Sequence, residues 1–381
     1  MSIFFRTFIL SLLFLFPLSS HASQALPVAA PPSVEARGYL VMDFHSGAVL
    51  AEREADSRME PASITKIMTA YVIYRELKNG SIGLEDEVRI SEKAWRMGGS
   101  RMFVEVNTRV KLKDLLKGMI VQSGNDATVA LAEHVAGSEE AFVSLMNQQA
   151  KALGMNDTHY TNSTGWPDPE LYTTARDIAR LAHALIRDFP EEYRWYSERE
   201  FTYNGIRQHN RNLMLWRDES VDGVKTGHTE SAGFCLVTSA KRDDMRLITV
   251  VLGTASEKDR ADQTQTLLNW GFRFFETHRL YTAGQPLTET RVWKGETDKV
   301  ALGLTRDLYV TIPRGRYQAL KATLELSPKL EAPLQKGAVQ GEVNVTLDGA
   351  VIRKESLIAL QAVEEGGILR RAMDTVMQWF D

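Results

Sequence analysis

The alternation of apolar and polar residues predicts that the longer, N-terminal part of the chain mixes strands with helices. Two β-type runs, residues 38–43 and 48–52, flank a turn that contains His45 and Gly47, which is typical of a β-hairpin. His45 is interpreted as a turn residue only. Helices are expected at residues 67–77, 111–119, 126–135, 174–187 and 263–276, and further strands at residues 233–239 and 247–252.

These elements together indicate an α/β (α+β) domain in which helices flank an antiparallel sheet. We place it at residues 37–284, after an extended, proline-containing lead-in at residues 23–36. Residues 156–173 are rich in Asn, Asp, Thr, Gly and Pro and are expected to form a long loop of the kind that often borders a site.

The pattern changes in the C-terminal part, where short β-type runs alternate with turn residues between residues 287 and 360. This spacing predicts a small all-β domain, which we place at residues 285–365. It contains no recognisable catalytic constellation, so we interpret it as a spacer or stalk.

The last segment, residues 366–381, shows helical periodicity with one apolar face. The apolar positions are Ile368, Leu369, Ala372, Met373, Val376, Met377 and Phe380, with Trp379 beside them. The polar positions are Arg370, Arg371, Asp374, Gln378 and Asp381. The terminal location and the aromatic residues favour a helix that lies in a membrane interface; docking on the β domain is the alternative.

The first 22 residues are typical of a secretory signal peptide. Arg6 precedes an apolar run at residues 8–16, Pro17 ends that run, and small residues follow around Ala22 and Ala25. An uncleaved membrane anchor is the alternative, but the run is short for a spanning helix. The protein is therefore expected to be exported.

Composition excludes some classes of function. The 381-residue chain has a net charge of −4, so nucleic acid is not an expected partner. Its only cysteine, Cys235, cannot form a disulfide within the chain and lies in an apolar run that predicts a core position. The histidines form no H-x-x-x-H pair with a carboxylate partner, which disfavours a metal-dependent peptidase, and no cofactor is expected.

The candidate chemistry begins at Ser63 and Lys66, three residues apart after Pro61. On a helix, residues three apart share a face, so the lysine amine and the serine hydroxyl can meet. A buried lysine with a lowered pKa could then take the proton of the serine. For this motif on its own, the alternative is a purely structural role, in which the serine caps a helix and the lysine is solvated.

Two later motifs change the balance between these interpretations. Ser123-Gly124-Asn125 is expected on a turn between two helices, where a capping role would otherwise be the simplest interpretation. Lys225-Thr226-Gly227 precedes the predicted strands. S-x-x-K, S-x-N and K-T-G in this order form the signature of the penicillin-recognising serine enzymes.

The motifs, their order and the two appended parts resemble the low-molecular-mass penicillin-binding proteins. The match is best with D-alanyl-D-alanine carboxypeptidases of the penicillin-binding protein 5 and 6 type. His228 directly after K-T-G and the domain layout narrow the resemblance to this group. It implies a transpeptidase/β-lactamase-like fold and a periplasmic protein attached peripherally to the outer face of the cytoplasmic membrane.

The resemblance also implies a reaction on peptidoglycan stem peptides that end in D-Ala-D-Ala, with β-lactams as covalent inhibitors. Ser63 would attack the penultimate carbonyl, Lys66 would act as base, and Ser123 would pass a proton to the departing amine. The implied substrate-binding residues are Asn125, Lys225, Thr226, Gly227, His228, Arg211 and Arg260. The backbone N–H groups of Ser63 and His228 would hold the oxyanion. Lys225 and Thr226, with Arg211 or Arg260, would meet the terminal carboxylate.

Two alternative functions remain at this point. A serine β-lactamase of class A would carry a loop glutamate in an E-x-x-L-N pattern; Glu170 is present here, but the pattern is not. A non-catalytic penicillin sensor or cell-wall binding module need not retain a nucleophile and its base, so the intact motif set argues against it.

Overall fold

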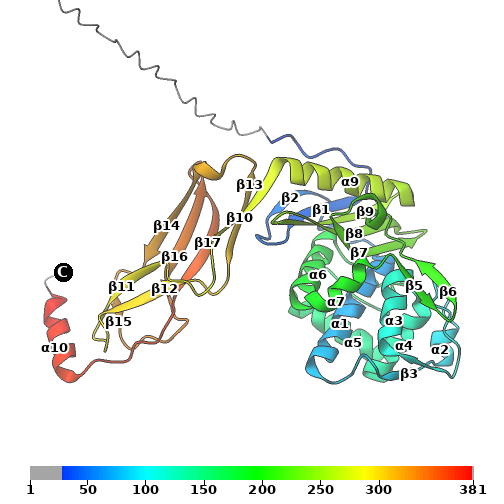
Figure 1. The fold of residues 1–381 in the computed structure, drawn as a ribbon, viewed down its shortest axis with the longest axis horizontal. Helices are drawn as coiled ribbons and strands as arrows, with labels where there is room; N and C mark the ends of the chain where they lie inside the picture. Colours follow the sequence, from blue (N-terminus) through cyan, green and yellow to red (C-terminus); the bar gives the residue numbers. More distant parts are fainter. Residues whose placement is uncertain (1–27, 380–381) are drawn as a thin grey trace, which may run out of the picture.

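The computed structural model describes residues 28–379. The predicted signal peptide, together with Phe380 and Asp381 of the predicted terminal helix, lies outside the described residues. Figure 1 shows a larger body in which helices surround a sheet, a narrower body made of strands, and a short helix at the far end of the strands.

The larger body is built on a five-stranded antiparallel sheet with the order β2-β1-β9-β8-β7. Its strands are β1 (Gly38–Asp43), β2 (Val49–Arg53), β7 (Val221–Thr229), β8 (Gly233–Arg242) and β9 (Met245–Thr254). The predicted hairpin is confirmed, because β1 pairs with β2 from Tyr39 opposite Arg53 onward. The K-T-G motif lies on the edge strand β7. The sequence pattern predicted only the two strands that follow it, β8 and β9.

Helices and short strands complete this body. The helices are α1 (Lys66–Asn79), α2 (Glu92–Trp95), α3 (Leu112–Lys117), α4 (Asn125–Ala136), α5 (Glu139–Ala152), α6 (Ala175–Asp188), α7 (Pro190–Tyr193), α8 (Met214–Arg217) and α9 (Glu257–Phe274). Single turns are η1 (Ala62–Thr65), the π-helical η2 (Gly118–Gln122) and η3 (Arg194–Ser197). Two small hairpins pair β3 (Glu87–Arg89) with β4 (Arg109–Lys111) and β5 (Glu200–Tyr203) with β6 (Ile206–His209).

Two predicted helices have different bounds in the structure. The helix expected at residues 111–119 ends at Lys117 and continues as the π-helical turn. The helix expected from residue 263 begins at Glu257, because Ser256 caps its polar first turn by accepting a hydrogen bond from the Asp259 N–H. Apolar periodicity does not reveal this first turn, because its residues are polar.

The sheet separates two hydrophobic cores. One face packs against the helices that include α1, α4 and α6, and the other packs against α9, which lies across the opposite side of the sheet in Figure 1. Trp270 and Phe272 of α9 are buried, as predicted. Cys235 is also a core residue, and burial raises the pKa of its thiol to about 11.

The narrower body contains the remaining strands around its own apolar core. The strands are β10 (Phe275–Tyr281), β11 (Thr288–Trp293), β12 (Lys299–Gly303), β13 (Leu308–Pro313), β14 (Leu320–Leu326), β15 (Leu330–Glu331), β16 (Val339–Leu347) and β17 (Ala350–Ala359), with the turn η4 (Tyr317–Ala319). Six of them form a sheet with the order β14-β16-β17-β12-β11-β15, and β10 pairs with β13. Because β10 follows α9 directly, we infer that the division between the domains lies near residue 275 and not at the predicted residue 284.

The two bodies meet at the turn between β1 and β2. The buried Asp43 carboxylate accepts a hydrogen bond from the Thr277 hydroxyl (2.8 Å), and the Ser46 and Thr311 hydroxyls lie 2.6 Å apart. The His45 ring stacks on Tyr309 at 4.7 Å between ring centroids. His45 is therefore a contact between domains as well as a turn residue, which the sequence interpretation missed.

Asp126, at the start of α4, fastens the loop that leads to the S-x-N turn. Its carboxylate accepts hydrogen bonds from the backbone N–H groups of Met102 (2.8 Å), Phe103 (2.8 Å) and Val104 (3.2 Å). We predict that Asp126→Asn lowers the free energy of unfolding by about 2–3 kcal/mol, because the amide places N–H donors against backbone donors.

Denaturant unfolding measures this difference. Asp244→Asn, at an exposed position, is the matched control and should stay within about 0.5 kcal/mol of the parent protein. Equal stability of the two variants would show that the carboxylate does not hold the loop.

Candidate active site

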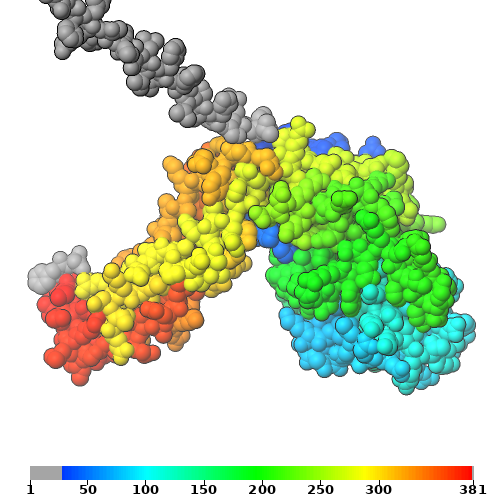
Figure 2. Space-filling model, viewed as in Figure 1, coloured from blue at the N-terminus to red at the C-terminus, as the bar shows by residue number. Residues whose placement is uncertain are grey.

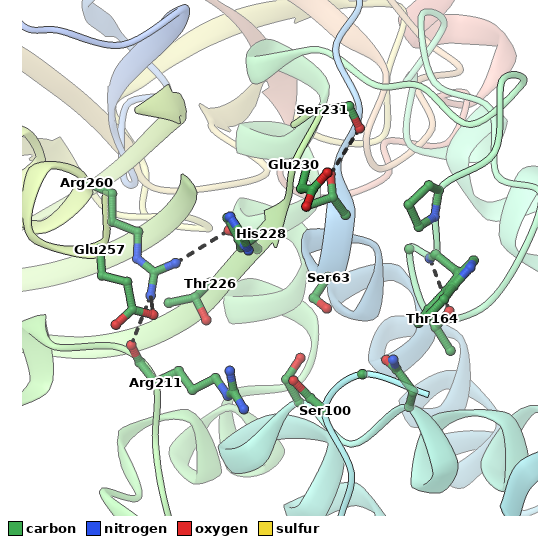
Figure 3. A pocket seen from close by; sticks show the side chains of 18 residues that line it. Ser63, Ser100, Thr164, Arg211, Thr226, His228, Glu230, Ser231, Glu257 and Arg260 are labelled. Carbon is green, nitrogen blue, oxygen red and sulfur yellow. Dashed lines mark hydrogen bonds and ion pairs between the residues drawn. The ribbon is translucent and has the colours of Figure 1, made fainter. Parts of the chain in front are cut away.

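The three sequence motifs meet in one cleft with a volume of about 860 Å³. The residues that line it are Ser63 on η1, Ser123 at the end of η2, Asn125 at the start of α4, and Thr226, Gly227 and His228 on β7. In Figure 3, Ser63 lies at the centre, with Arg211, Arg260 and Glu257 on one side and Thr164 on the other. Residues far apart in the sequence are thus brought together at the edge of the sheet.

Lys66 is fully enclosed beside Ser63 and is held by three oxygens. Its side-chain nitrogen Nζ lies 3.0 Å from the Ser63 hydroxyl, 2.7 Å from Asn125 Oδ1 and 2.7 Å from the Thr164 carbonyl. A carbonyl or amide oxygen can only accept a hydrogen bond. When Lys66 is neutral, its two N–H groups therefore point at Asn125 and Thr164, and its lone pair points at the Ser63 hydroxyl.

The environment of Lys66 favours this neutral form. Burial lowers the pKa of Lys66 to about 7, the cation of Arg211 contributes to the lowering, and Asp126 opposes it. The lysine can thus lose its proton near neutral pH and act as a base, which the sequence interpretation required.

Close backbone packing holds Ser63 in place. Ala62, directly before it, has a left-handed backbone (φ 47°), which is strained for a residue with a side chain. A Cβ atom on Gly165 would lie 1.7 Å from the Ala62 carbonyl oxygen, and one on Gly227 would lie 2.9 Å from the Pro61 carbonyl oxygen. Both glycines are therefore needed for the loop and the edge strand to pack against the turn that carries Ser63.

Ser123 faces the cleft from a second strained position. It ends the π-helical turn with a left-handed backbone (φ 66°), is buried, and lines the cleft. Within residues 28–379 its hydroxyl has no hydrogen-bond partner. An unpaired buried hydroxyl at a cleft is available to a bound substrate.

Cations gather at one end of the cleft. Burial and the neighbouring Lys66, Arg211 and Arg260 lower the pKa of Lys225 well below its usual value. Arg260 is buried and forms an ion pair with Glu257 at 3.1 Å. The exposed Arg211 guanidinium makes no hydrogen bond or ion pair within the described part of the chain, so it is the free cation at this end.

Several cleft residues were not identified from the sequence. The Thr164 carbonyl has no sequence signature, because any residue supplies a backbone carbonyl. Trp166 and Glu230 also line the cleft, and only the composition of the long loop hinted at Trp166. Glu170, considered above for a β-lactamase, is exposed and does not line the cleft.

Comparison with known proteins shows the family to which this chain belongs. Residues 25–256 match the family model described as D-alanyl-D-alanine carboxypeptidase, and residues 275–365 match the penicillin-binding protein 5 C-terminal domain. The chain is 46% identical over 379 residues to the D-alanyl-D-alanine carboxypeptidase DacC of Escherichia coli, covering 96% of this chain and 95% of that protein. DacA of the same organism is 45% identical over 357 residues, which is 92% of this chain and 89% of DacA. The structure of penicillin-binding protein 5 from Haemophilus influenzae superimposes with a TM-score of 0.86 at 45% identity, covering 88% of this chain and all of that one.

The lowered pKa of Lys66 predicts the pH dependence of acylation. The rate at which a penicillin acylates Ser63 should rise with pH with a midpoint near 7, as Lys66 loses its proton. Arg211→Gln should move that midpoint upward, because removing a nearby cation makes it easier for Lys66 to keep its proton. Stopped-flow acylation at saturating penicillin over pH 5–10 measures the midpoint independently of binding.

Arg199→Gln, at an exposed arginine outside the cleft, is the control and should leave the midpoint in place. A midpoint above 9 in the parent protein, or an unchanged midpoint in Arg211→Gln, would contradict this account of the base.

Proposed function

The chain belongs to the D-alanyl-D-alanine carboxypeptidases of the penicillin-binding protein 5/6 type, and we propose that Ser63 is its nucleophile and Lys66 its general base. It is a serine-type carboxypeptidase that removes the terminal D-alanine from peptides ending in D-Ala-D-Ala. The observation that supports this assignment best is the position of the buried Lys66 amine, 3.0 Å from the Ser63 hydroxyl. The amine also donates to the Asn125 and Thr164 oxygens, which can only accept hydrogen bonds.

In the first half of the reaction, Lys66 takes the proton of the Ser63 hydroxyl as its oxygen attacks the penultimate D-Ala carbonyl. The backbone N–H groups of Ser63 and His228 stabilise the negative charge that develops on the carbonyl oxygen. The C–N bond then breaks, and the proton that Lys66 has taken moves through the Ser123 hydroxyl to the departing amine, which restores both residues. Free D-alanine leaves, and the peptide stays on Ser63 as an ester.

In the second half, water attacks this ester and restores the Ser63 hydroxyl. No carboxylate of the loop at residues 156–173 lines the cleft. We therefore propose that a β-lactam, which leaves a bulkier acyl group on Ser63, is released slowly and acts as a covalent inhibitor. A dedicated β-lactamase would instead need to release this acyl group rapidly.

Different residues of the cleft bind the terminal carboxylate and the amide of the substrate. Arg211 meets the terminal carboxylate, with Lys225 and Thr226 beside it, and Arg260 braces this end through its contacts with Glu257 and the Gly227 carbonyl. Asn125 has a second task besides the substrate amide assigned to it above. Its Oδ1 orients Lys66, and its Nδ2 donates to the Gly98 carbonyl at 2.8 Å.

Release of D-alanine from a stem pentapeptide tests the assignment. We predict that Ser63→Ala lowers kcat by at least about 10⁴-fold while the protein stays folded, because the acyl-enzyme cannot form. Ser197→Ala, at an exposed serine outside the cleft, is the control and should match the parent protein. Rapid penicillin turnover without D-alanine release would instead indicate a β-lactamase, and stable penicillin labelling without either activity would indicate a sensor.

We further propose that α10 (Ile368–Met377) attaches the protein to the outer face of the cytoplasmic membrane. The helix rests on the β domain through its polar side: the buried Asp374 carboxylate accepts a hydrogen bond from the Lys294 N–H (2.6 Å), and Gln378 donates to Glu331 (3.0 Å). Its apolar side faces outward, with Leu369 88% and Trp379 80% exposed. Docking and membrane contact, the two alternatives considered above, thus use opposite faces of one helix.

The position of α10 suits a surface anchor. Figure 2 shows it at the end of the β domain that lies farthest from the catalytic domain, so the strands act as a spacer. Among the helices within residues 28–379, none is long and apolar enough to cross a bilayer. The attachment we propose is therefore peripheral.

Vesicle sedimentation tests this proposal. The double variant Leu369→Glu/Met373→Glu of the signal-free chain should lose binding to anionic phospholipid vesicles by about 10-fold or more, because two charges enter the apolar face, and should keep its D-alanine release. Val339→Glu, at a 61% exposed valine of the β domain, should bind vesicles like the parent protein. Unchanged sedimentation of the double variant would exclude α10 as the anchor.

A further inference from the structure

The Thr164 carbonyl, which accepts a hydrogen bond from Lys66, belongs to a loop segment without helix or strand. No ladder of backbone hydrogen bonds sets the direction of a carbonyl in such a segment, so other contacts must set it. Ser163, the residue directly before Thr164, is fully buried, and all three of its polar groups are bonded. Ser163 is therefore the point at which the rest of the domain holds this loop.

Glu139, the first residue of α5, binds both donors of Ser163. One oxygen of its carboxylate accepts hydrogen bonds from the Ser163 backbone N–H (3.0 Å) and from the Ser163 hydroxyl (2.6 Å). The other oxygen pairs with the Lys93 amine of α2 at 2.9 Å. Burial raises the pKa of Glu139, but the bonds from Ser163 and Lys93 outweigh burial and hold this pKa below its usual value. The carboxylate is thus charged at neutral pH, and hydrogen bonds to a charged acceptor are strong.

Thr69 binds the remaining polar group of Ser163. Its buried hydroxyl, on α1 one turn beyond Lys66, donates to the Ser163 carbonyl at 2.6 Å. The Thr164 N–H, in the same peptide plane, donates to Asn162 Oδ1 at 3.2 Å. Because a peptide unit is planar, these bonds and those of Glu139 fix the two peptide planes that precede the Thr164 carbonyl.

Glu139 is linked to the base through these bonds and not through a direct contact. Its charge is balanced by Lys93. Within residues 28–379, the oxygens bonded to the Lys66 amine do not include those of Glu139; they belong to Ser63, Asn125 and Thr164. The charged groups that face Lys66 from the elements around it are Arg211, Lys225 and Asp126.

We propose that Glu139 is a positioning residue for the proton transfer: through Ser163, it keeps the Thr164 carbonyl directed at the Lys66 amine. This role rests on the proposed function, in which neutral Lys66 is the base. Without Glu139, the carbonyl is free to turn away, and the amine keeps only the Asn125 oxygen as an acceptor. The lone pair of the amine then points at the nucleophile for only part of the time, and acylation slows.

Stopped-flow acylation at saturating penicillin over pH 5–10 tests this role. Glu139→Ala should lower the limiting rate at high pH by about 10-fold or more, because small misplacements of reacting groups cost at least this much. Its midpoint should lie below that of the parent protein, because the charged form of Lys66 loses more from a missing acceptor than the neutral form does. Glu139→Gln should regain most of the limiting rate, since its amide oxygen can still accept both bonds from Ser163.

The same experiment separates positioning from a purely structural role. The penicillin concentration that gives half the limiting rate should change by less than about two-fold, because Glu139 does not line the cleft. A residue that only stabilised the fold would lower the fraction of folded protein, which thermal unfolding measures. The limiting rate and the midpoint of the folded fraction would then stay at the parent values.

Glu140→Ala is the matched control. Glu140 is exposed and pairs with the same Lys93 amine at 3.1 Å, whereas the polar groups of Ser163 are bonded to Glu139 and Thr69. This variant should therefore keep the limiting rate and the midpoint of the parent protein. Thr69→Val, which releases the Ser163 carbonyl, should lower the limiting rate by about five-fold and is the decisive variant if Glu139→Ala does not fold.

A parent-like rate and midpoint in folded Glu139→Ala would overturn this role, as would an equal loss of rate in Glu140→Ala. Where Glu139→Ala does not fold, a parent-like rate in Thr69→Val would overturn it. A parent protein that penicillin does not acylate, or whose midpoint lies above about 9, would instead count against the proposed function.

Discussion

The burial of one lysine amine is the constraint on which the rest of this structure depends. An ammonium group enclosed in protein loses most of its hydration, so its neutral form becomes accessible near neutral pH, as the lowered pKa of Lys66 reflects. A neutral amine is useful as a base only if its lone pair points at the nucleophile. The Asn125 and Thr164 oxygens achieve this by occupying the two N–H groups.

Much of the surrounding architecture holds those oxygens in position. Asp126 gathers the backbone N–H groups of the loop that packs on Asn125, and the Asn125 N–H itself donates to the Ser100 carbonyl at 2.7 Å. Gly165 lets the loop that carries Thr164 lie against the turn of Ser63. The strained backbone of Ala62 persists because the loop that carries Gly165 packs directly against it.

The catalytic domain and α10 differ in where their hydrophobic side chains lie. The catalytic domain buries it on both faces of its sheet, whereas α10 uses its polar residues for docking and leaves its apolar residues outside. This arrangement is costly in water unless another apolar phase covers the exposed face. This exposed apolar face is the observation behind the membrane attachment that we propose for α10.

The sequence by itself determined the fold class and the family, and its motifs contain the residues that we propose as the reacting groups. Hydrophobic periodicity and short motifs such as Ser63–Lys66 depend on residues close together in the chain, so they can be read without coordinates. The amphipathic face of the last helix is readable for the same reason. Only the tertiary structure decided that, within residues 28–379, Arg211 is unpaired while Arg260 is paired, that the Thr164 carbonyl accepts a hydrogen bond from Lys66, and that Trp166 and Glu230 share the cleft with Ser63. Those facts depend on which distant segments meet and which side chains are already occupied, and local sequence patterns carry no record of either.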